Sequence, residues 1–274
     1  MHDDWRRQLL AQAAALLMLL GAADARAEDR RAGTIEEKIQ AAKVIEATLA
    51  TRDASAEEWR KLDQIYADLA AKFPADARVR NAHGESLWSR SERDRAMVQW
   101  TAAEKLDPKN GVVLDHLADG WLAEGNVRKA AAFAARAVSN EPGNAAYHFA
   151  LANISFLFRH ELTDAAHADS EAVLRRALSH FAEASRLAPD NAEYARAYAE
   201  TFYSISNPDW QAALAAWTRF FELVPQKDFA LLNLGRVHLK LGQKQAALDC
   251  LSRIQGTQYE KLKRRLEAQA NGAP

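Results

Sequence analysis

The spacing of the prolines constrains this sequence most. Pro74, Pro108 and Pro142 follow one another at equal intervals, and the next two intervals, to Pro189 and Pro225, are longer. A proline cannot continue a helix, because it lacks the backbone N–H group and its ring clashes with the preceding turn. Prolines at a nearly regular interval therefore predict a chain built from repeats of about 34 residues, each closed by a turn.

The residues between these prolines favour helices. Ala, Leu, Glu and Arg dominate there, and these residues lose little side-chain entropy in a helix. No window shows the alternation of β-branched residues that is typical of a strand. With 49% hydrophobic and 27% charged residues the chain has the composition of a globular protein. We therefore expect an all-α fold.

The regular interval also carries a pattern of small and large residues. Segments 77–110 and 111–144 align without a gap, and they place small residues where two helices would cross closely and large residues beside them. The pattern is carried by Gly84, Leu87, Ala96, Trp100 and Ala103 in the first segment and by Leu114, Leu117, Ala118, Trp121, Ala130, Ala134 and Ala137 in the second. Closed by a proline, it resembles the tetratricopeptide repeat (TPR), which is a pair of antiparallel helices.

This resemblance covers roughly residues 34–261 and implies an architecture for the whole chain. It implies a right-handed α-solenoid of antiparallel helix pairs, in a single domain over residues 28–274, that ends in a C-terminal capping helix. The expected repeats, about six, lie near residues 34–76, 77–110, 111–144, 145–191, 192–227 and 228–261, and the cap lies at 261–271.

The interval from Pro142 to Pro189 is the longest of the series. We place the excess near residues 159–171, between the two helices of the fourth repeat, and expect both helices to be lengthened into an extended hairpin. Side chains that can bind metals crowd this connection, namely His160, Glu161, Asp164, His167 and Asp169. They lack a fixed ligand spacing, so we interpret them as a polar loop and assign no metal site.

The first 27 residues have the composition of an export signal. Two arginines precede an apolar run from Leu9 to Ala23, and Ala25 and Ala27 occupy the small-residue positions of a cleavage site. The run is shorter than the ~20 residues of a membrane span. We expect a signal peptide over residues 1–27, used by the general secretion or the twin-arginine route, and a periplasmic or secreted bacterial protein. An amphipathic or anchored N-terminal helix is the alternative.

The sequence offers little chemistry. It lacks the H-E-x-x-H, G-x-S-x-G, G-K-[ST] and C-x-x-C motifs, and its formal net charge of −1 supplies no field for nucleic acid. Cys250 is the only cysteine, which excludes an intramolecular disulfide, and we expect it to be a small buried thiol. We therefore predict no catalytic residue, no cofactor, no nucleic-acid partner and no small-molecule ligand.

The resemblance also implies a binding surface. In TPR proteins the first helices of successive repeats line a concave groove, and the second, fifth, ninth and twelfth positions of each repeat point into it. The corresponding residues of this chain are Asn81, Glu85, Trp88, Asp115, Asp119, Phe149, Asn153, Phe156, Arg196, Glu200, Tyr203 and Arg236, with Leu122, Leu232 and Leu239 beside them. The acids at the start of this set would repel the C-terminal carboxylate that one TPR subfamily binds. Solvated helix faces without a ligand are the alternative interpretation.

These observations favour a non-enzymatic scaffold. We expect it to bind a partner peptide or protein in the groove and to assist the assembly or maturation of an envelope complex. The alternative is an accessory or substrate-recruiting subunit of an envelope enzyme or of a polysaccharide secretion complex.

Overall fold

The computed structural model describes residues 34–163 and 169–272. Within these ranges the chain forms thirteen α-helices, two short 3₁₀ helices and no strand, which confirms the predicted all-α fold. No helix in this part of the chain is both long and apolar enough to cross a membrane. The chain divides into two compact units between Leu117 and Ala118. The predicted signal peptide lies outside the described residues, and the single domain stays a prediction.

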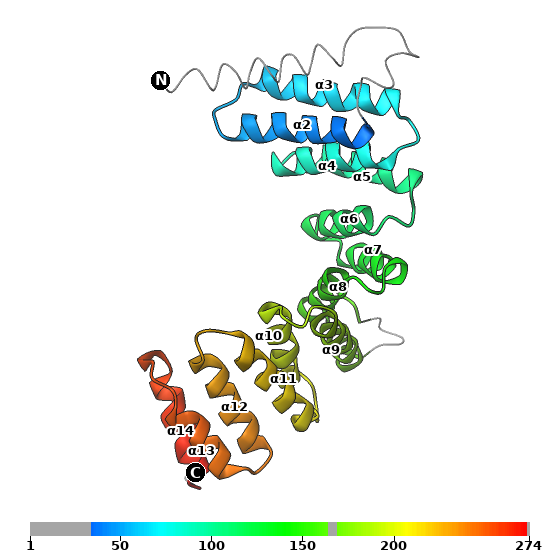
Figure 1. The fold of residues 1–274 in the computed structure, drawn as a ribbon. Helices are drawn as coiled ribbons and strands as arrows, with labels where there is room; N and C mark the ends of the chain where they lie inside the picture. The colour runs from blue at the N-terminus through cyan, green and yellow to red at the C-terminus, as the bar shows by residue number, and fades with distance from the viewer. Residues whose placement is uncertain (1–33, 164–168, 273–274) are drawn as a thin grey trace, which may run out of the picture. The chain divides into compact units, whose positions relative to one another are not determined.

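The first unit contains two complete helix pairs. Capping boxes begin its first two helices: the side chains of Thr34 and Ser55 each accept the N–H three residues on, and Glu37 and Glu58 accept the N–H groups of the caps in return. Its helices are α2 (Ile35–Ala50), α3 (Ala56–Lys72), α4 (Ala77–Ser89), α5 (Arg93–Leu106) and the first part of α6 (Gly111–Ala123) (Figure 1).

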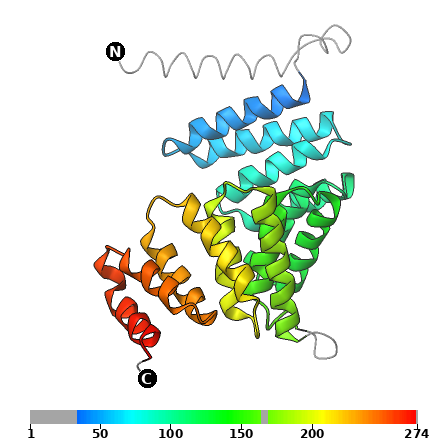
Figure 2. The same cartoon turned by 60° about the horizontal axis from the view of Figure 1, so that its bottom comes forward.

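The second unit continues the alternation of first and second helices. Consecutive helices from α7 to α14 pack against one another, and both views show them side by side (Figures 1 and 2). After the end of α6, its elements are α7 (Val127–Asn140), α8 (Ala145–Leu157), α9 (Ser170–Leu187), α10 (Ala192–Thr201), η1 (Phe202–Ser204), α11 (Trp210–Leu223), α12 (Asp228–Lys240), α13 (Lys244–Ser252), η2 (Thr257–Tyr259) and α14 (Glu260–Ala270).

The turns between repeats combine a proline with a helix cap. Four of the five spaced prolines are followed two residues later by Asp or Asn, and this residue accepts a hydrogen bond from the first turn of the next helix. The caps are Asp76, Asn110, Asn144 and Asn191. The proline ends one helix and the Asp or Asn begins the next, so each turn is specified on both sides.

The core of a helix pair is a close contact between a small and a large residue. Gly84 of α4 faces the fully buried Trp100 of α5, and Gly235 of α12 faces the fully buried Leu251 of α13. Gly84 and Trp100 belong to the small and large pattern of the segment 77–110, and Gly235 and Leu251 occupy the corresponding positions of the repeat at 228–261. The predicted close crossing is therefore present in both units.

The irregular fourth repeat differs from the expectation in one of its two helices. Helix α8 has 13 residues, as α4 and α6 do, so the prediction that it is lengthened is wrong. Helix α9 has 18 residues against 14 in α5 and α7, and the connection 158–169 is much longer than the corresponding 90–92. The additional residues are thus shared between the connection and α9. Residues 164–168 of this connection, including Asp164 and His167, lie outside the described residues.

Candidate functional site

In the first unit the predicted groove residues form hydrogen bonds between successive first helices. Glu85 of α4 forms an ion pair with Lys43 of α2, with 2.9 Å between Nζ and Oε2. Asn81 donates to Glu85 Oε1 at 2.7 Å, and its Oδ1 accepts from Nδ1 of His116 on α6 at 2.9 Å. These side chains link three helices, so part of their hydrogen-bonding capacity is used by the fold itself.

Trp88 and the two aspartates complete the N-terminal part of the set. Trp88 is half-buried, its ring centroid is 5.3 Å from that of Trp100, and the guanidinium of Arg93 lies over it at 5.6 Å. Asp115 is half-buried and belongs to the first unit, while Asp119 is exposed and belongs to the second. The predicted set therefore divides between the two units, and each part is a surface in its own right.

In the second unit α8 presents two aromatic rings with an amide between them. Phe149 lies 4.4 Å from the ring of Tyr194 and 5.7 Å from that of Phe181, and Phe156 lies 6.3 Å from Phe181. Asn153 stands between the two phenylalanines, is half-buried, and forms no hydrogen bond with any described residue. Its amide has donors and an acceptor that an extended peptide backbone can use.

The remaining predicted residues bring charge beside aromatic rings. Arg196 of α10 donates to Glu200 at 2.9 Å, and its guanidinium lies 5.0 Å from the ring of Phe229. The guanidinium of Arg236 lies 4.2 Å from the ring of Tyr203. Burial raises the pKa of Tyr203 to about 12, so its hydroxyl stays protonated and remains a hydrogen-bond donor.

Two of the neighbouring leucines are less available than the sequence suggests. Leu232 is 2% exposed and packs in a cluster with Leu266 of α14, so its assignment to an open groove is wrong. Leu239 is half-buried against the same cluster. The C-terminal helix packs on this part of α12, which removes Leu232 from the accessible surface of the last repeat.

A partly buried charge cluster in the first unit was not predicted. Asp63 of α3 accepts from Arg90 at 2.6 Å and from Arg95 at 2.7 Å, and it lies 3.5 Å from Nε2 of His83. Burial favours a higher pKa for Asp63, but the two arginines outweigh it and lower the pKa. Burial also lowers the pKa of His83, whose ring stacks on Tyr66 at 5.0 Å. Because Asp63 is paired with both arginines, we interpret the cluster as a structural link that holds α3, α4 and α5 together.

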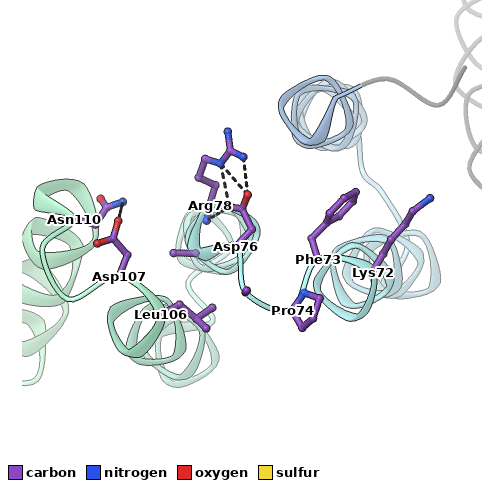
Figure 3. A pocket seen from close by; sticks show the side chains of 10 residues that line it. Lys72, Phe73, Pro74, Asp76, Arg78, Leu106, Asp107 and Asn110 are labelled. Atoms are coloured by element: carbon purple, nitrogen blue, oxygen red, sulfur yellow. Dashed lines mark hydrogen bonds and ion pairs between the residues drawn. The ribbon is translucent and has the colours of Figure 1, made fainter. Parts of the chain in front are cut away.

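The first unit also contains a shallow cavity beside the turn at Pro74. Its volume is about 730 Å³, and Figure 3 shows the side chains that line it. Its two carboxylates are paired locally: Asp76 pairs with Arg78, which lowers the pKa of Asp76, and Asp107 accepts from Asn110 at 3.3 Å. The cavity is a by-product of the turns and caps, and we do not assign a ligand to it.

Titratable groups elsewhere in the described residues do not assemble into a metal site. No group of three or more His, Cys, Asp or Glu side chains lies close enough together there to hold an ion. His148 and His180 meet through their Nδ1 atoms at 3.0 Å, so one donates and the other accepts. Cys250 is half-buried, and the prediction of a buried thiol is corrected accordingly. Burial raises the pKa of this thiol, which disfavours the reactive thiolate.

Solved structures share this architecture. No protein-family model and no curated protein matches the sequence. YrrB, described as a TPR protein with an unusual peptide-binding site, aligns at a TM-score of 0.57 and 16% identity over 76% of this chain and 97% of its own. PilF of Pseudomonas aeruginosa aligns at 0.56 and 14% identity, over 87% and 98%. The MamA protein aligns at 0.52 and 16% identity, over 70% and 94%. At these low identities, the structural likeness shows a common fold and nothing more.

Proposed function

We propose that this chain, which has the tetratricopeptide-repeat fold, is a non-enzymatic scaffold that binds an extended segment of a partner protein along the first helices of its second unit. The observation that carries the proposal is the surface of α8. Phe149 and Phe156 flank Asn153, whose amide has no partner among the described residues. Half-buried aromatic rings supply apolar anchors, and an unused amide between them can pair with a peptide backbone.

The cellular setting is a second part of the proposal. We infer export through the signal peptide over residues 1–27, and a role in the assembly or maturation of an envelope complex follows from that location. The apolar run and the Ala25 and Ala27 cleavage positions support it. The mass of the mature protein tests this part, because a chain that keeps Met1 is not processed.

Peptide selection tests the scaffold itself. Short random peptides displayed on phage are selected on the immobilised full chain, and the affinities of synthetic copies are measured by fluorescence anisotropy. We expect Asn153→Ala to weaken binding about three- to tenfold, because a hydrogen bond contributes about 0.5–1.5 kcal/mol. Val98→Ala is the control, since Val98 is 64% exposed on α5, a second helix. Failure to select any peptide, or equal affinities for Asn153→Ala and wild type, would contradict the proposal.

A further inference from the structure

Two cations of α12 lie over two aromatic rings of the preceding repeat. The guanidinium carbon of Arg236 is 4.2 Å from the ring centroid of Tyr203, and Nζ of Lys240 is 5.7 Å from that of Trp210. Arg236 and Lys240 are four residues apart and so share one face of the helix. The two rings are themselves 5.8 Å apart, so the cations occupy neighbouring positions on one aromatic surface. We call these four residues the cationic shelf.

Arg236 is held in place before any ligand arrives. Its Nη1 donates to Oδ1 of Asn233 at 3.1 Å, and Asn233 is 2% exposed. Asn233 is fixed in turn, because its Nδ2 donates to the backbone oxygen of Phe229 and its own backbone oxygen accepts from the Tyr203 hydroxyl. A stacked and hydrogen-bonded guanidinium loses little conformational entropy when it binds, and four of its five N–H groups remain available.

No carboxylate in the part of the chain that the structure describes neutralises the cationic shelf. Neither Arg236 nor Lys240 forms an ion pair with a carboxylate among the described residues. The neighbouring acids are engaged elsewhere: Glu200 accepts from Arg196, and Asp209 caps α11 through the N–H groups of its first turn. The guanidinium of Arg236 is half-buried on Tyr203 and has less water around it than on an open surface, which strengthens its attraction for an anion, whereas Lys240 is exposed.

We propose that the cationic shelf binds the carboxylate of an Asp or Glu side chain in the partner segment, next to an apolar residue that contacts Trp210. The planar guanidinium of Arg236 can accept a carboxylate on two N–H groups, and Lys240 adds a second charge. This inference rests on the proposed function, since it names the chemistry of the segment that the scaffold binds. It also places the acidic residue within that segment, because the acid would lie at α12 while another part of the segment contacts Asn153 and its two phenylalanines at α8.

The selected peptides provide the test. We expect them to be enriched in Asp or Glu, and we expect replacement of that acid by its amide to weaken binding to the full chain about tenfold at low salt. In Arg236→Gln and Lys240→Gln the acid and amide peptides should bind more nearly equally. Arg236→Lys should keep part of the preference, because it retains the charge and loses the planar fork. Thermal unfolding of each variant establishes that it is folded.

Arg253→Gln is the matched control. Arg253 also lies over a ring, at 5.3 Å from Phe221, but it follows α13, a second helix outside the predicted groove, so its removal should leave the preference for acid unchanged. Peptides that bind through Asn153 with equal affinity for acid and amide would overturn the inference and leave the proposed function standing. A preference that survives Arg236→Gln would overturn it as well. If no peptide binds the wild-type chain, the inference falls together with the proposed function.

Discussion

At the scale of single residues, Gly84 sets the distance between α4 and α5. A Cβ atom at this position would lie 2.3 Å from Nε1 and 2.5 Å from Cδ1 of Trp100. Trp100 is 1% exposed and has no space into which its ring can move freely. The tryptophan therefore requires a glycine opposite it, whereas Leu251 leaves 3.1 Å at the corresponding Gly235.

The first prediction concerns this contact. We expect Gly84→Ala to lower the free energy of unfolding by about 1–3 kcal/mol, the usual cost of overpacking a core. The loss should appear although Ala is favoured over Gly within a helix by about 1 kcal/mol. Urea denaturation followed by circular dichroism measures it. Gly143→Ala is the control, because nothing lies within 4 Å of a Cβ atom there. A Gly84→Ala chain as stable as the wild type would contradict the prediction.

The buried His83 leads to a second prediction, on pH. Burial lowers the pKa of His83 in the folded state, whereas the unfolded chain has a pKa near 6.5. The unfolded state then binds more protons below about pH 6.5, so the stability supplied by neutral His83 is present above this pH and is lost as the pH falls. The lowered pKa of Asp63 acts only below about pH 4, so the two windows are separate.

Urea unfolding at pH 7.5 and pH 5.5 tests this sign. We expect the wild type to be less stable at pH 5.5, and His83→Gln to reduce the difference by at most about 1.4 kcal/mol, the value of one pKa unit. His160→Gln is the control, because His160 is exposed. If the free energy of unfolding changed between pH 7.5 and pH 5.5 as much in His83→Gln as in the wild type, groups other than His83 would cause the pH dependence.

At the scale of elements, the longer α9 holds the next connection along the chain. A second helix as long as α5 or α7 that ended at Leu187 would begin at Leu174, so Glu171 lies in the additional turn. Both carboxylate oxygens of Glu171 accept the N–H of Ser206, at 3.1 and 3.2 Å, and Arg175 donates to the Ser206 backbone oxygen at 2.6 Å. The additional turn of α9 thus holds the connection 205–209 in place through hydrogen bonds.

A third prediction follows from this contact. We expect Glu171→Ala to speed hydrogen exchange at the Ser206 amide and its neighbours, with a loss of global stability of only about 1–2 kcal/mol, because an exposed connection is released and the core is untouched. Hydrogen–deuterium exchange with mass spectrometry measures this effect. Arg176→Ala, an exposed position on the same helix, should leave the exchange of residues 205–209 unchanged. Equal exchange in both variants would contradict the assigned role of Glu171.

At the scale of the whole molecule, a stack of repeats needs an end that faces water. The last helix pair would expose Leu231, Leu232, Leu251 and Ile254, and Leu266 of α14 packs on this cluster. Terminal repeats of solenoids require such a polar cover for solubility. The charged residues of α14 lie on its other side, where Lys261, Arg264 and Arg265 are exposed.

The fourth prediction concerns this cover. We expect Leu266→Ala to lower the free energy of unfolding by about 2–5 kcal/mol, because it removes a buried side chain from the cluster. We also expect it to increase concentration-dependent association in light scattering. Leu262→Ala is the control on the same helix, since Leu262 is 36% exposed, and its effect should stay within about 0.5 kcal/mol. Equal effects of the two substitutions would contradict a capping role.

The prolines, the Asp and Asn caps and the small residues at crossing positions were sufficient to predict the helices and their pairing, because each acts on the backbone within a few residues of itself. The length of α8 was not predictable in this way. Its apolar end "ISFLF" suggested a longer helix, yet the helix ends at Leu157, so the excess residues went into the connection and α9. Periodicity alone does not say on which side of a turn additional residues fold.

The candidate site, too, was only partly predictable from the sequence. Sequence position placed Asn153, Phe156 and Arg236 on first helices, as the structure has them, whereas Tyr203 lies in the short 3₁₀ helix η1 that follows α10. Only the tertiary structure decided which of the predicted groove residues are free to contact a partner. Leu232 is buried against α14, Glu85 is paired with Lys43, and Arg236 lies over the ring of Tyr203. The physical reason is the distance along the sequence over which each kind of interaction acts. Turns and caps depend on neighbours along the chain, whereas burial, pairing of charges and stacking depend on residues that belong to other helices and repeats.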